Sequence, residues 1–384
     1  MKAIQKFLLA AMAALVLFSC DKDDYIPGQG SGGAGSNNNN EETPEAVAGR
    51  VVIAYVTYYG KAIPEAAHLT HINYAFAEPY MSNGVYEGIG LQGKLQDSED
   101  RFRQIVDLKA KYPNLKIGIS FTNAKENARG GCFSQLAKSA DYRLKFAQDC
   151  KAFLEKWKID GVDLDWEFPG LSWSGDAGAY DRAVDVQNHI LLMKQLRESL
   201  GSRYFLTYAG YCLDKTAVSG GYQYIDIKAV APYVDFVNIM TYDLDAGDEG
   251  GDHQSALNDP KAYSDCTRAV QTYLNAGMPA SKLVLGIPFY GRISFSSNPG
   301  AINYNKIITL GAGYKIDNWD ENASVPYVTY NGKYYCGYDN PKSIAIKGEW
   351  LLAKGMKGMM FWDYDGDDAE GTLRKAVWEA TMKK

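Results

Sequence analysis

The chain has 384 residues, which is enough for two or three average domains or for one large barrel with an insertion. Its 46% hydrophobic and 22% charged residues are the ordinary mixture of a globular protein. A net charge of −6 without a basic stripe argues against nucleic acid as a partner. The 28 Tyr and 7 Trp leave sugar binding open, because aromatic rings stack on sugars but Tyr also fills cores.

The N-terminus predicts export. Lys2 and Lys6 precede an apolar run, Phe7–Phe18, which is shorter than the about 20 residues that span a bilayer. Residues 1–20 therefore read as a secretory signal peptide. The end of this run resembles a bacterial lipobox, which predicts lipidation of Cys20 and membrane contact through that anchor. The acidic stretch Asp21–Asp24 resembles the tag of surface-exposed lipoproteins, so we expect an outer membrane lipoprotein facing the cell surface. The alternative is an ordinary cleaved signal with a chance cysteine.

Residues 21–48 predict a flexible linker, since Gly28–Gly33 and Asn37–Asn40 cannot bury enough surface to order the chain. Five cysteines follow Cys20, an odd number without a CxxC pair, so disulfides are permitted by export but cannot be assigned. With only 4 His and no Cys/His cluster, we predict no metal site and no cofactor. These cysteines are Cys132, Cys150, Cys212, Cys266 and Cys336.

From residue 49 to 384, short apolar runs alternate with amphipathic segments. The runs are apolar on both faces, as buried parallel strands are, and segments 97–112, 139–158 and 180–200 predict helices between them. Eight such strands predict an α/β fold, a (β/α)8 TIM barrel. A doubly wound sheet is the alternative, but no glycine-rich phosphate loop follows the first strand. The predicted strands are Val51–Tyr58, Thr70–Glu78, Leu115–Phe121, Gly161–Glu167, Tyr204–Ala209, Val234–Thr241, Leu283–Tyr290 and Lys357–Trp362.

The stretch between strands 7 and 8, about residues 293–340, is too long for a plain loop. It holds strand-like runs at Tyr327–Tyr330 and Lys333–Tyr338. We therefore predict a small inserted α+β subdomain there.

The fourth predicted strand carries three carboxylates on one face. Asp163, Asp165 and Glu167 alternate with an apolar set, so the acids point into the barrel while the apolar residues meet the helices. Burying carboxylates is costly unless they are paired, hydrogen-bonded or protonated. Pro169–Gly170 ends the strand and places Glu167 at the carboxyl end, where barrel active sites lie. The alternative is an edge strand with a solvated acidic face, for which the apolar opposite face gives no reason.

The motif D-x-x-D-x-D-x-E over Asp160–Glu167 is identified as that of glycoside hydrolase family 18. Further matches follow the family's order: Met240–Asp243 after strand 6, Gly286–Arg292 after strand 7, and Trp362 at the end of strand 8. The insertion stands where chitinases of this family carry theirs. The resemblance covers roughly residues 50–380 and implies a chitinase-like hydrolase.

The resemblance implies roles for single residues. Glu167 would protonate the glycosidic oxygen, and the substrate's own acetamido carbonyl would be the nucleophile. Asp165 would hold the acetamido N–H, with Asp163 behind it tuning its charge, and Tyr242 would bind the acetamido oxygen. Substrate-binding candidates are Asp243, Met240, Trp362, Arg292, Trp173, Tyr55 and Phe76.

Purely structural roles remain possible for several of these residues. Tyr242 and Trp362 could be barrel filling, Arg292 a structural ion-pair partner, and Trp173 a partner contact. Asp160 has the opposite parity to the other acids, so a structural hydrogen bond is favoured over catalysis.

Substrate is the least determined point. The family usually has Ser-x-Gly-Gly after strand 3, whereas Ser120–Asn123 lacks both glycines, which changes the backbone path beside the active site. The stretch Asp252–Leu257 resembles the corresponding chitinase segment and favours linear N-acetylglucosamine chains. The alternatives are an endo-β-N-acetylglucosaminidase acting on N-linked glycans and a non-catalytic carbohydrate-binding lipoprotein. Because no aromatic soon follows Asp243, we expect short soluble chitooligosaccharides to be better substrates than crystalline chitin.

Overall fold

The computed structural model describes residues 44–93, 95–123, 133–170, 184–211, 225–244, 253–260, 262, 264–293 and 300–384. The predicted signal peptide, Cys20 and most of the linker lie outside these residues, as do Trp173, Cys132 and Cys212. Among the described residues, Cys150, Cys266 and Cys336 are buried free thiols. Within the same part of the chain, no helix is both long and apolar enough to cross a membrane.

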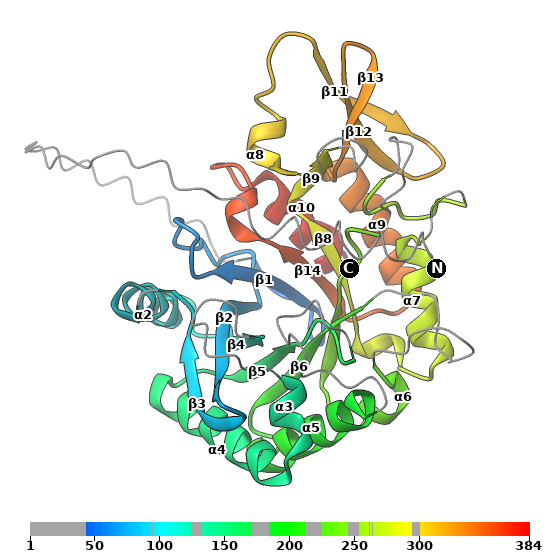
Figure 1. The fold of residues 1–384 in the computed structure, drawn as a ribbon. Coiled ribbons are helices and arrows are strands. Elements are labelled where there is room, and N and C mark those ends of the chain that lie inside the picture. The colour runs from blue at the N-terminus through cyan, green and yellow to red at the C-terminus, as the bar shows by residue number, and fades with distance from the viewer. Residues whose placement is uncertain are drawn as a thin grey trace, which may run out of the picture.

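The predicted (β/α)8 barrel is confirmed. Its strands are all parallel, and β1 pairs with both β2 and β14, which closes the sheet into a ring (Figure 1). The barrel strands are β1 (Val51–Thr57), β2 (His71–Ser82), β4 (Lys116–Thr122), β5 (Gly161–Asp165), β6 (Phe205–Gly210), β7 (Phe236–Ile239), β8 (Leu283–Pro288) and β14 (Gly358–Trp362).

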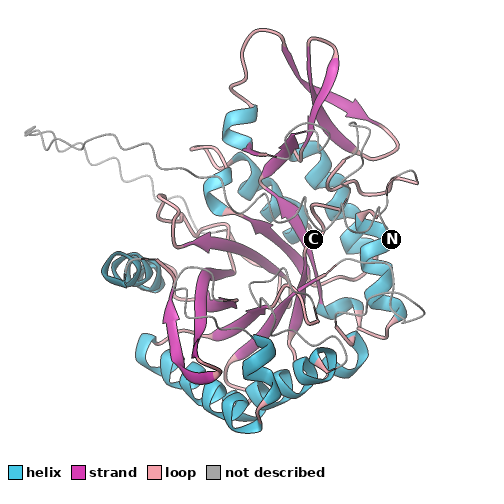
Figure 2. Cartoon of the chain, viewed as in Figure 1, coloured by secondary structure: helices cyan, strands magenta, loops and turns pink. Residues whose placement is uncertain are grey.

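Helices lie around the outside of this ring (Figure 2). Helix α4 begins at the N-cap Ser139, whose side chain accepts from the Tyr142 N–H, and ends at Lys158 in the left-handed conformation. Helix α9 begins with a capping box between Asn340 and Ser343. The helices are α2 (Leu95–Lys111), α3 (Phe133–Lys138), α4 (Ala140–Trp157), α5 (Asp185–Leu200), α6 (Ile227–Val230), α7 (Cys266–Asn275), α9 (Pro341–Ala353) and α10 (Thr372–Met382).

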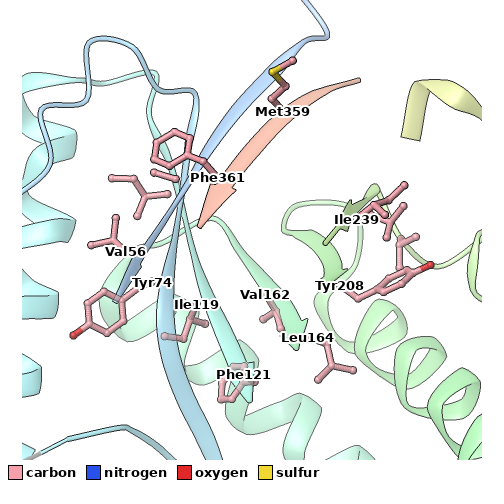
Figure 3. Close-up of a cluster of buried hydrophobic side chains, with 14 of the residues drawn as sticks. Val56, Tyr74, Ile119, Phe121, Val162, Leu164, Tyr208, Ile239, Met359 and Phe361 are labelled. Atoms are coloured by element: carbon pink, nitrogen blue, oxygen red, sulfur yellow. The ribbon is translucent and has the colours of Figure 1, made fainter. Parts of the chain in front are cut away.

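Alternating side chains build two apolar layers. The outward residues of the strands pack against the helices in one large cluster, and Figure 3 shows part of it, including Val56, Ile119 and Val162. The inward residues of β1, among them Ile53 and Tyr55, form a second, smaller cluster inside the ring with inward residues of β2, β7, β8 and β14. Both faces of these strands are therefore buried, which is why their sequences are apolar throughout.

One hairpin was not predicted. Strand β2 continues four residues beyond the predicted end at Glu78 and pairs antiparallel with β3 (Val85–Leu91). The turn between them is Asn83-Gly84, with φ values of 50° and 78°, and Asn-Gly is the typical pair for this two-residue turn. Tyr86 of β3 then donates a hydrogen bond to Asp149 on α4 (2.8 Å), which holds the hairpin over the helix layer.

The predicted α+β insertion forms a second sheet at the top of Figure 1. Its strands are antiparallel in the order β10-β9-β13-β12-β11. Strand β9 follows β8 after one residue, so the insertion begins directly at the carboxyl end of a barrel strand. The elements are β9 (Tyr290–Ile293), β10 (Ala301–Asn303), α8 (Tyr304–Ile307), β11 (Tyr314–Asp320), β12 (Val325–Tyr330) and β13 (Lys333–Gly337).

Candidate active site

Strand β5 carries its acids into the barrel. Asp163 is fully buried and Asp165 is 5% exposed, while Glu167 is partly exposed. On the opposite face, Trp166 packs against Phe133 of α3 and His189 of α5, with ring centroids 5.6 and 5.9 Å apart. Strand β5 ends at Asp165, two residues earlier than predicted, so Glu167 lies just beyond the strand at the carboxyl mouth of the barrel.

Four strands donate hydrogen bonds to Asp163. Its Oδ2 accepts from Tyr55 Oη and Ser120 Oγ (2.8 Å each), and its Oδ1 accepts from Thr207 Oγ1 (2.6 Å) and Asn238 Nδ2 (3.2 Å). Burial raises the pKa of Asp163, and these four bonds act against that rise because they favour the charged form. The carboxylate is therefore fixed in position beneath Asp165.

Tyr55 stays a donor in this network. Burial, followed by the charges of Asp163 and Asp165, raises the pKa of Tyr55 well above its usual value. Its hydroxyl also accepts from Asn238 Nδ2 at 3.1 Å. The phenol therefore remains protonated and helps to hold Asp163.

Aromatic rings surround the mouth. Trp362, at the end of β14, stacks on Phe76 with ring centroids 5.6 Å apart and lies 5.7 Å from the Tyr55 ring. Trp362 and Met240 are both partly buried against the inner cluster. Non-proline cis peptide bonds precede Phe76 and follow Glu167 and Trp362. The inner barrel thus ends in an aromatic floor next to the carboxylates.

Tyr242 packs against the same inner cluster as Trp362, and with Tyr290, Asp243 and Arg292 it forms a group of side chains that we call the wall of the site. Burial, then Tyr290, then the charges of Asp165 and Glu167 raise the pKa of Tyr242 well above its usual value. Its phenol is therefore a neutral donor within electrostatic reach of both acids. Strand β7 ends at Ile239, earlier than the predicted Thr241, so Tyr242 stands beyond the strand.

Asp243 and Arg292 are paired. Arg292 donates from Nε to Asp243 Oδ1 and from Nη2 to Asp243 Oδ2, both at 2.6 Å. Burial alone lowers the pKa of Arg292, but the Asp243 carboxylate outweighs it and raises the pKa. The guanidinium also lies over the Tyr290 ring, 5.2 Å from its centroid. This bidentate pair fixes one end of the wall.

The structure therefore brings ten predicted site residues to one end of the barrel, and Trp173 lies outside the described residues. No group of three or more His, Cys, Asp or Glu side chains within those residues could hold a metal ion. The ten are Glu167, Asp165, Asp163, Tyr242, Asp243, Met240, Trp362, Arg292, Tyr55 and Phe76.

The sequence matches the family model of the glycosyl hydrolases family 18 over residues 51–367. The chain belongs to this family. Chitinase A1 of Niallia circulans is 34% identical over 306 residues, which are 69% of this chain and 42% of that protein. The endochitinase of Manduca sexta is 29% identical over 342 residues, 79% of this chain and 59% of that protein. The chain thus spans about half the length of these two relatives.

Solved structures agree with this assignment. The group IV chitinase of Ostrinia furnacalis, crystallised with allosamidin, superposes with a TM-score of 0.72 at 26% identity. The superposition covers 85% of this chain and 97% of that one. The likeness therefore covers most of this chain and nearly all of that one.

Asp160, the first acid of the family 18 motif, has a structural position. Its Oδ2 accepts from the Ile117 N–H (2.8 Å) and from Lys109 Nζ (2.7 Å), and Lys116 Nζ lies 3.4 Å from its Oδ1. These contacts join β5 to β4 and α2 at the amino end of the barrel. The structural interpretation of Asp160 is thus confirmed.

Sequence reasoning missed two of the four residues that donate to Asp163. Thr207 and Asn238 were not singled out, although each is a polar residue at an inward position of an otherwise apolar strand. Asp363, which follows Trp362, was also missed: burial and then the charge of Asp365 raise its pKa to about 7. Polar residues at inward positions of several barrel strands are the sequence signal that indicates Thr207 and Asn238.

The segment that lacks the family's glycines continues β4. Ser120 still reaches Asp163, and the next inward residue, Thr122, is paired in register with Asp165. Asn123 Oδ1 accepts from the Phe133 N–H at 3.3 Å, which joins the strand end to α3. Side chains therefore occupy the space beside Asp165 that two glycines would leave open.

Proposed function

We propose that this family 18 protein hydrolyses β-1,4-linked N-acetylglucosamine chains, in chitin or chitooligosaccharides. The observation that carries the proposal is the stack of acids on β5, with Asp163 pinned by four donors below Asp165 and Glu167 at the mouth. The names of the chitinase relatives support the substrate class.

Glu167 would act as the general acid. Its proton passes to the glycosidic oxygen while the bond from that oxygen to C1 breaks. The acetamido carbonyl oxygen of the same sugar forms a bond to C1, which gives an oxazolinium ion. Tyr242, held neutral by its surroundings, would donate to that acetamido oxygen.

Asp165 would accept the acetamido N–H and balance the positive charge of the oxazolinium. Residues two apart on a strand lie roughly 6.6 Å apart, so Asp165 and Glu167, which lies just beyond the strand end, can both contact one sugar. Water, deprotonated by Glu167, then opens the ring on the face that the leaving group vacated. The released sugar would keep the β-configuration.

We further propose that the protein is exported and anchored in the outer membrane through a lipid on Cys20, facing the cell surface. The support is the lipobox-like Leu17–Cys20 and the acidic stretch after it. An anchor followed by the linker of residues 21–48 would let the barrel lie roughly 25–30 Å from the membrane, within reach of soluble oligosaccharides.

Product analysis tests the activity. Chitotetraose, crystalline chitin and a high-mannose glycopeptide are incubated in parallel and their products are identified by mass spectrometry. We expect fastest cleavage of chitotetraose, because Ser120–Asn123 and the region after Asp243 offer few aromatic platforms for a packed lattice. Fastest cleavage of the glycopeptide would replace the substrate with N-linked glycans, and binding without cleavage of any of the three would favour the non-catalytic alternative.

A further inference from the structure

The insertion sheet holds a pocket whose lining includes none of the acids of β5. Its volume is about 350 Å³, which lies within the range of small-ligand sites. Its residues come from strands β11, β12 and β13, from the turn after β11 and from the segment that follows β7. They are His253, Trp319, Asp320, Glu321, Tyr327 and Tyr334.

Tyr327 of the pocket and Arg292 lie on the same face of the insertion sheet. Gly337 of β13 is paired with Arg292 of β9 on one side and with Tyr327 of β12 on the other. Directly opposed residues of antiparallel strands point to the same face. Two strand spacings separate Arg292 from Tyr327, so their backbones are about 10 Å apart.

The missing side chain of Gly337 shapes the pocket. A Cβ atom at this position would lie 2.7 Å from Tyr334 Oη and 3.0 Å from His253 Nδ1. The imidazole and the phenol therefore approach the backbone directly. His253 is 4% exposed and packs edge-on against Tyr334, with ring centroids 5.8 Å apart.

Two tyrosines provide the aromatic surface. The rings of Tyr327 and Tyr334 are inclined by only 21°, with centroids 5.8 Å apart. Lys342 Nζ lies 3.5 Å from the centroid of the Trp319 ring, so one face of that indole is already covered by a cation. Stacking on a ligand would therefore come from the tyrosines.

Carboxylates complete the pocket. Asp320 Oδ1 accepts from the N–H groups of Asn322 (2.9 Å) and Ala323 (3.1 Å), and its Oδ2 lies 3.3 Å from His253 Nε2. Burial raises the pKa of Asp320, but these contacts outweigh burial and leave the pKa below its usual value. With exposed Glu321 beside it, the pocket presents acceptor oxygens and disfavours anionic ligands.

We propose that this pocket binds one pyranose unit of an N-acetylglucosamine oligosaccharide, as a carbohydrate site separate from the acids of β5. The apolar face of the sugar ring would lie on Tyr327 and Tyr334, and its hydroxyls would donate to Asp320 and Glu321. The sugar class rests on the proposed function above. A site about 10 Å from Arg292 would hold an oligosaccharide close to the catalytic end of the barrel.

His253 is the reporter for the test, because the chain has only 4 His and a spectrum of labelled imidazoles is simple. The Glu167→Gln protein is titrated with chitotriose, which it would not cleave, and the His253 signal is assigned by its loss in His253→Gln. We expect a saturable shift with a Kd on the order of millimolar. Tyr334→Ala should weaken it at least about tenfold.

Two further variants locate the response. Tyr330→Ala removes a 45% exposed tyrosine on the opposite face of the same sheet and should leave the His253 titration as it was. Trp362→Ala damages the aromatic floor of the barrel and should also leave it. Thermal unfolding of each variant is measured alongside, and Tyr334→Phe, which keeps the ring, should retain binding if Tyr334→Ala proves unstable.

The proposal is overturned if His253 does not respond to the sugar, if Tyr334→Ala responds like the parent, or if Trp362→Ala abolishes the shift. Failure of the proposed function is a different result: the parent protein would not cleave chitotetraose. The His253 titration can be read in either case, because it measures binding and not turnover.

Discussion

Arg292 donates a hydrogen bond of 2.6 Å to each carboxylate oxygen of Asp243. A planar guanidinium makes such a pair and a lysine ammonium cannot, so the two basic residues are not interchangeable here. Asp243 also has a φ of 55°, an unusual backbone conformation for a residue with a side chain. The pair therefore fixes the segment that carries Tyr242.

We expect Arg292→Lys to lower kcat/KM on chitotetraose about tenfold, equal to a loss of roughly 1.4 kcal/mol of transition-state stabilisation. Arg292→Met should be worse, because it leaves the Asp243 carboxylate without its partner. Steady-state kinetics of both variants against the parent measure the effect. Full activity in Arg292→Met would reduce the pair to a structural contact without influence on the site.

Glu167→Gln tests the general acid. The amide keeps the shape and a hydrogen bond but carries no transferable proton, so turnover should fall ~10²–10⁴-fold with substrate binding largely retained. Asp160→Asn is the matched control from the same motif, because the Asp160 carboxylate accepts from the Ile117 N–H and lies beside Lys109 and Lys116 at the amino end of the barrel.

Asp160→Asn should keep kcat and lose about 1–2 kcal/mol of folding stability, measured by denaturant unfolding, since one charge-assisted network weakens. More than about a tenth of parental activity in Glu167→Gln, or a large kcat loss in Asp160→Asn, would contradict the assignment of roles along β5.

The fold and the acids could be predicted from the sequence because both follow from alternation. Apolar runs on both faces give parallel strands, and the two-residue period places Asp163 and Asp165 on one face. The partners of Asp163 could not be predicted in the same way. They are separated from it by 43 to 108 residues along the chain, and only closure of the barrel brings them together.

Local signals were also present and not used. Asn83-Gly84 is a strong hairpin signal, and the β3 run after it is less apolar than the barrel strands, as suits a strand added at the edge of the barrel. The pocket around His253 could not be foreseen, because it depends on the pairing of β13 with β9 and β12.

Thr207→Val should shift the pH dependence of kcat/KM. The substitution keeps the shape of a fully buried residue and removes the 2.6 Å hydrogen bond to Asp163 Oδ1. That bond favours the charged form of Asp163. Burial already raises the pKa of Asp163, and the loss of the bond should raise it further. The acid limb of kcat/KM against pH should shift upward by about one unit, since 1.4 kcal/mol corresponds to one pKa unit.

The raised pKa of Asp163 also makes the stability of the fold depend on pH. Because the folded-state pKa of Asp163 is raised, its favourable contribution is full below the unfolded pKa and is lost as pH rises through the folded pKa. Thr207→Val should therefore destabilise the protein more at neutral pH than in acid. Thr207→Ser keeps the hydroxyl and should show neither change; an unshifted acid limb in Thr207→Val would contradict the account.

Cys20→Ala should convert a membrane-associated protein into a soluble exported one. A lipid anchor contributes about 0.8 kcal/mol per buried CH₂, so its loss should move the protein from the detergent phase to the aqueous phase in a phase-separation assay. Cys132→Ala, which removes another thiol, serves as the control and should partition like the parent. Equal partitioning of Cys20→Ala and the parent would remove the lipobox interpretation.

A buried ion pair supports the active-site wall from behind. Lys347 of α9 and Asp339 are both fully buried, and Lys347 Nζ lies 2.8 Å from each carboxylate oxygen. Lys347 also donates to Ser255 Oγ (2.8 Å), and Ser255 donates to the Thr241 carbonyl (2.7 Å). The pair thus reaches the residue before Tyr242.

Lys347→Met should cost about 3–5 kcal/mol of unfolding free energy, because it leaves the Asp339 carboxylate buried without a cation. The double variant Lys347→Met with Asp339→Asn removes both charges and should be more stable than Lys347→Met alone. In the parent, Ser343 Oγ donates to Asp339 Oδ1 (2.6 Å), and the amide of the variant stays near that hydroxyl. Denaturant unfolding of the parent, both single variants and the double variant gives the coupling energy. If the two single losses add up to the loss in the double variant, the two charges do not stabilise one another. If the double variant loses much less than that sum, the single variants are destabilised mainly by the one charge that they leave buried without a partner.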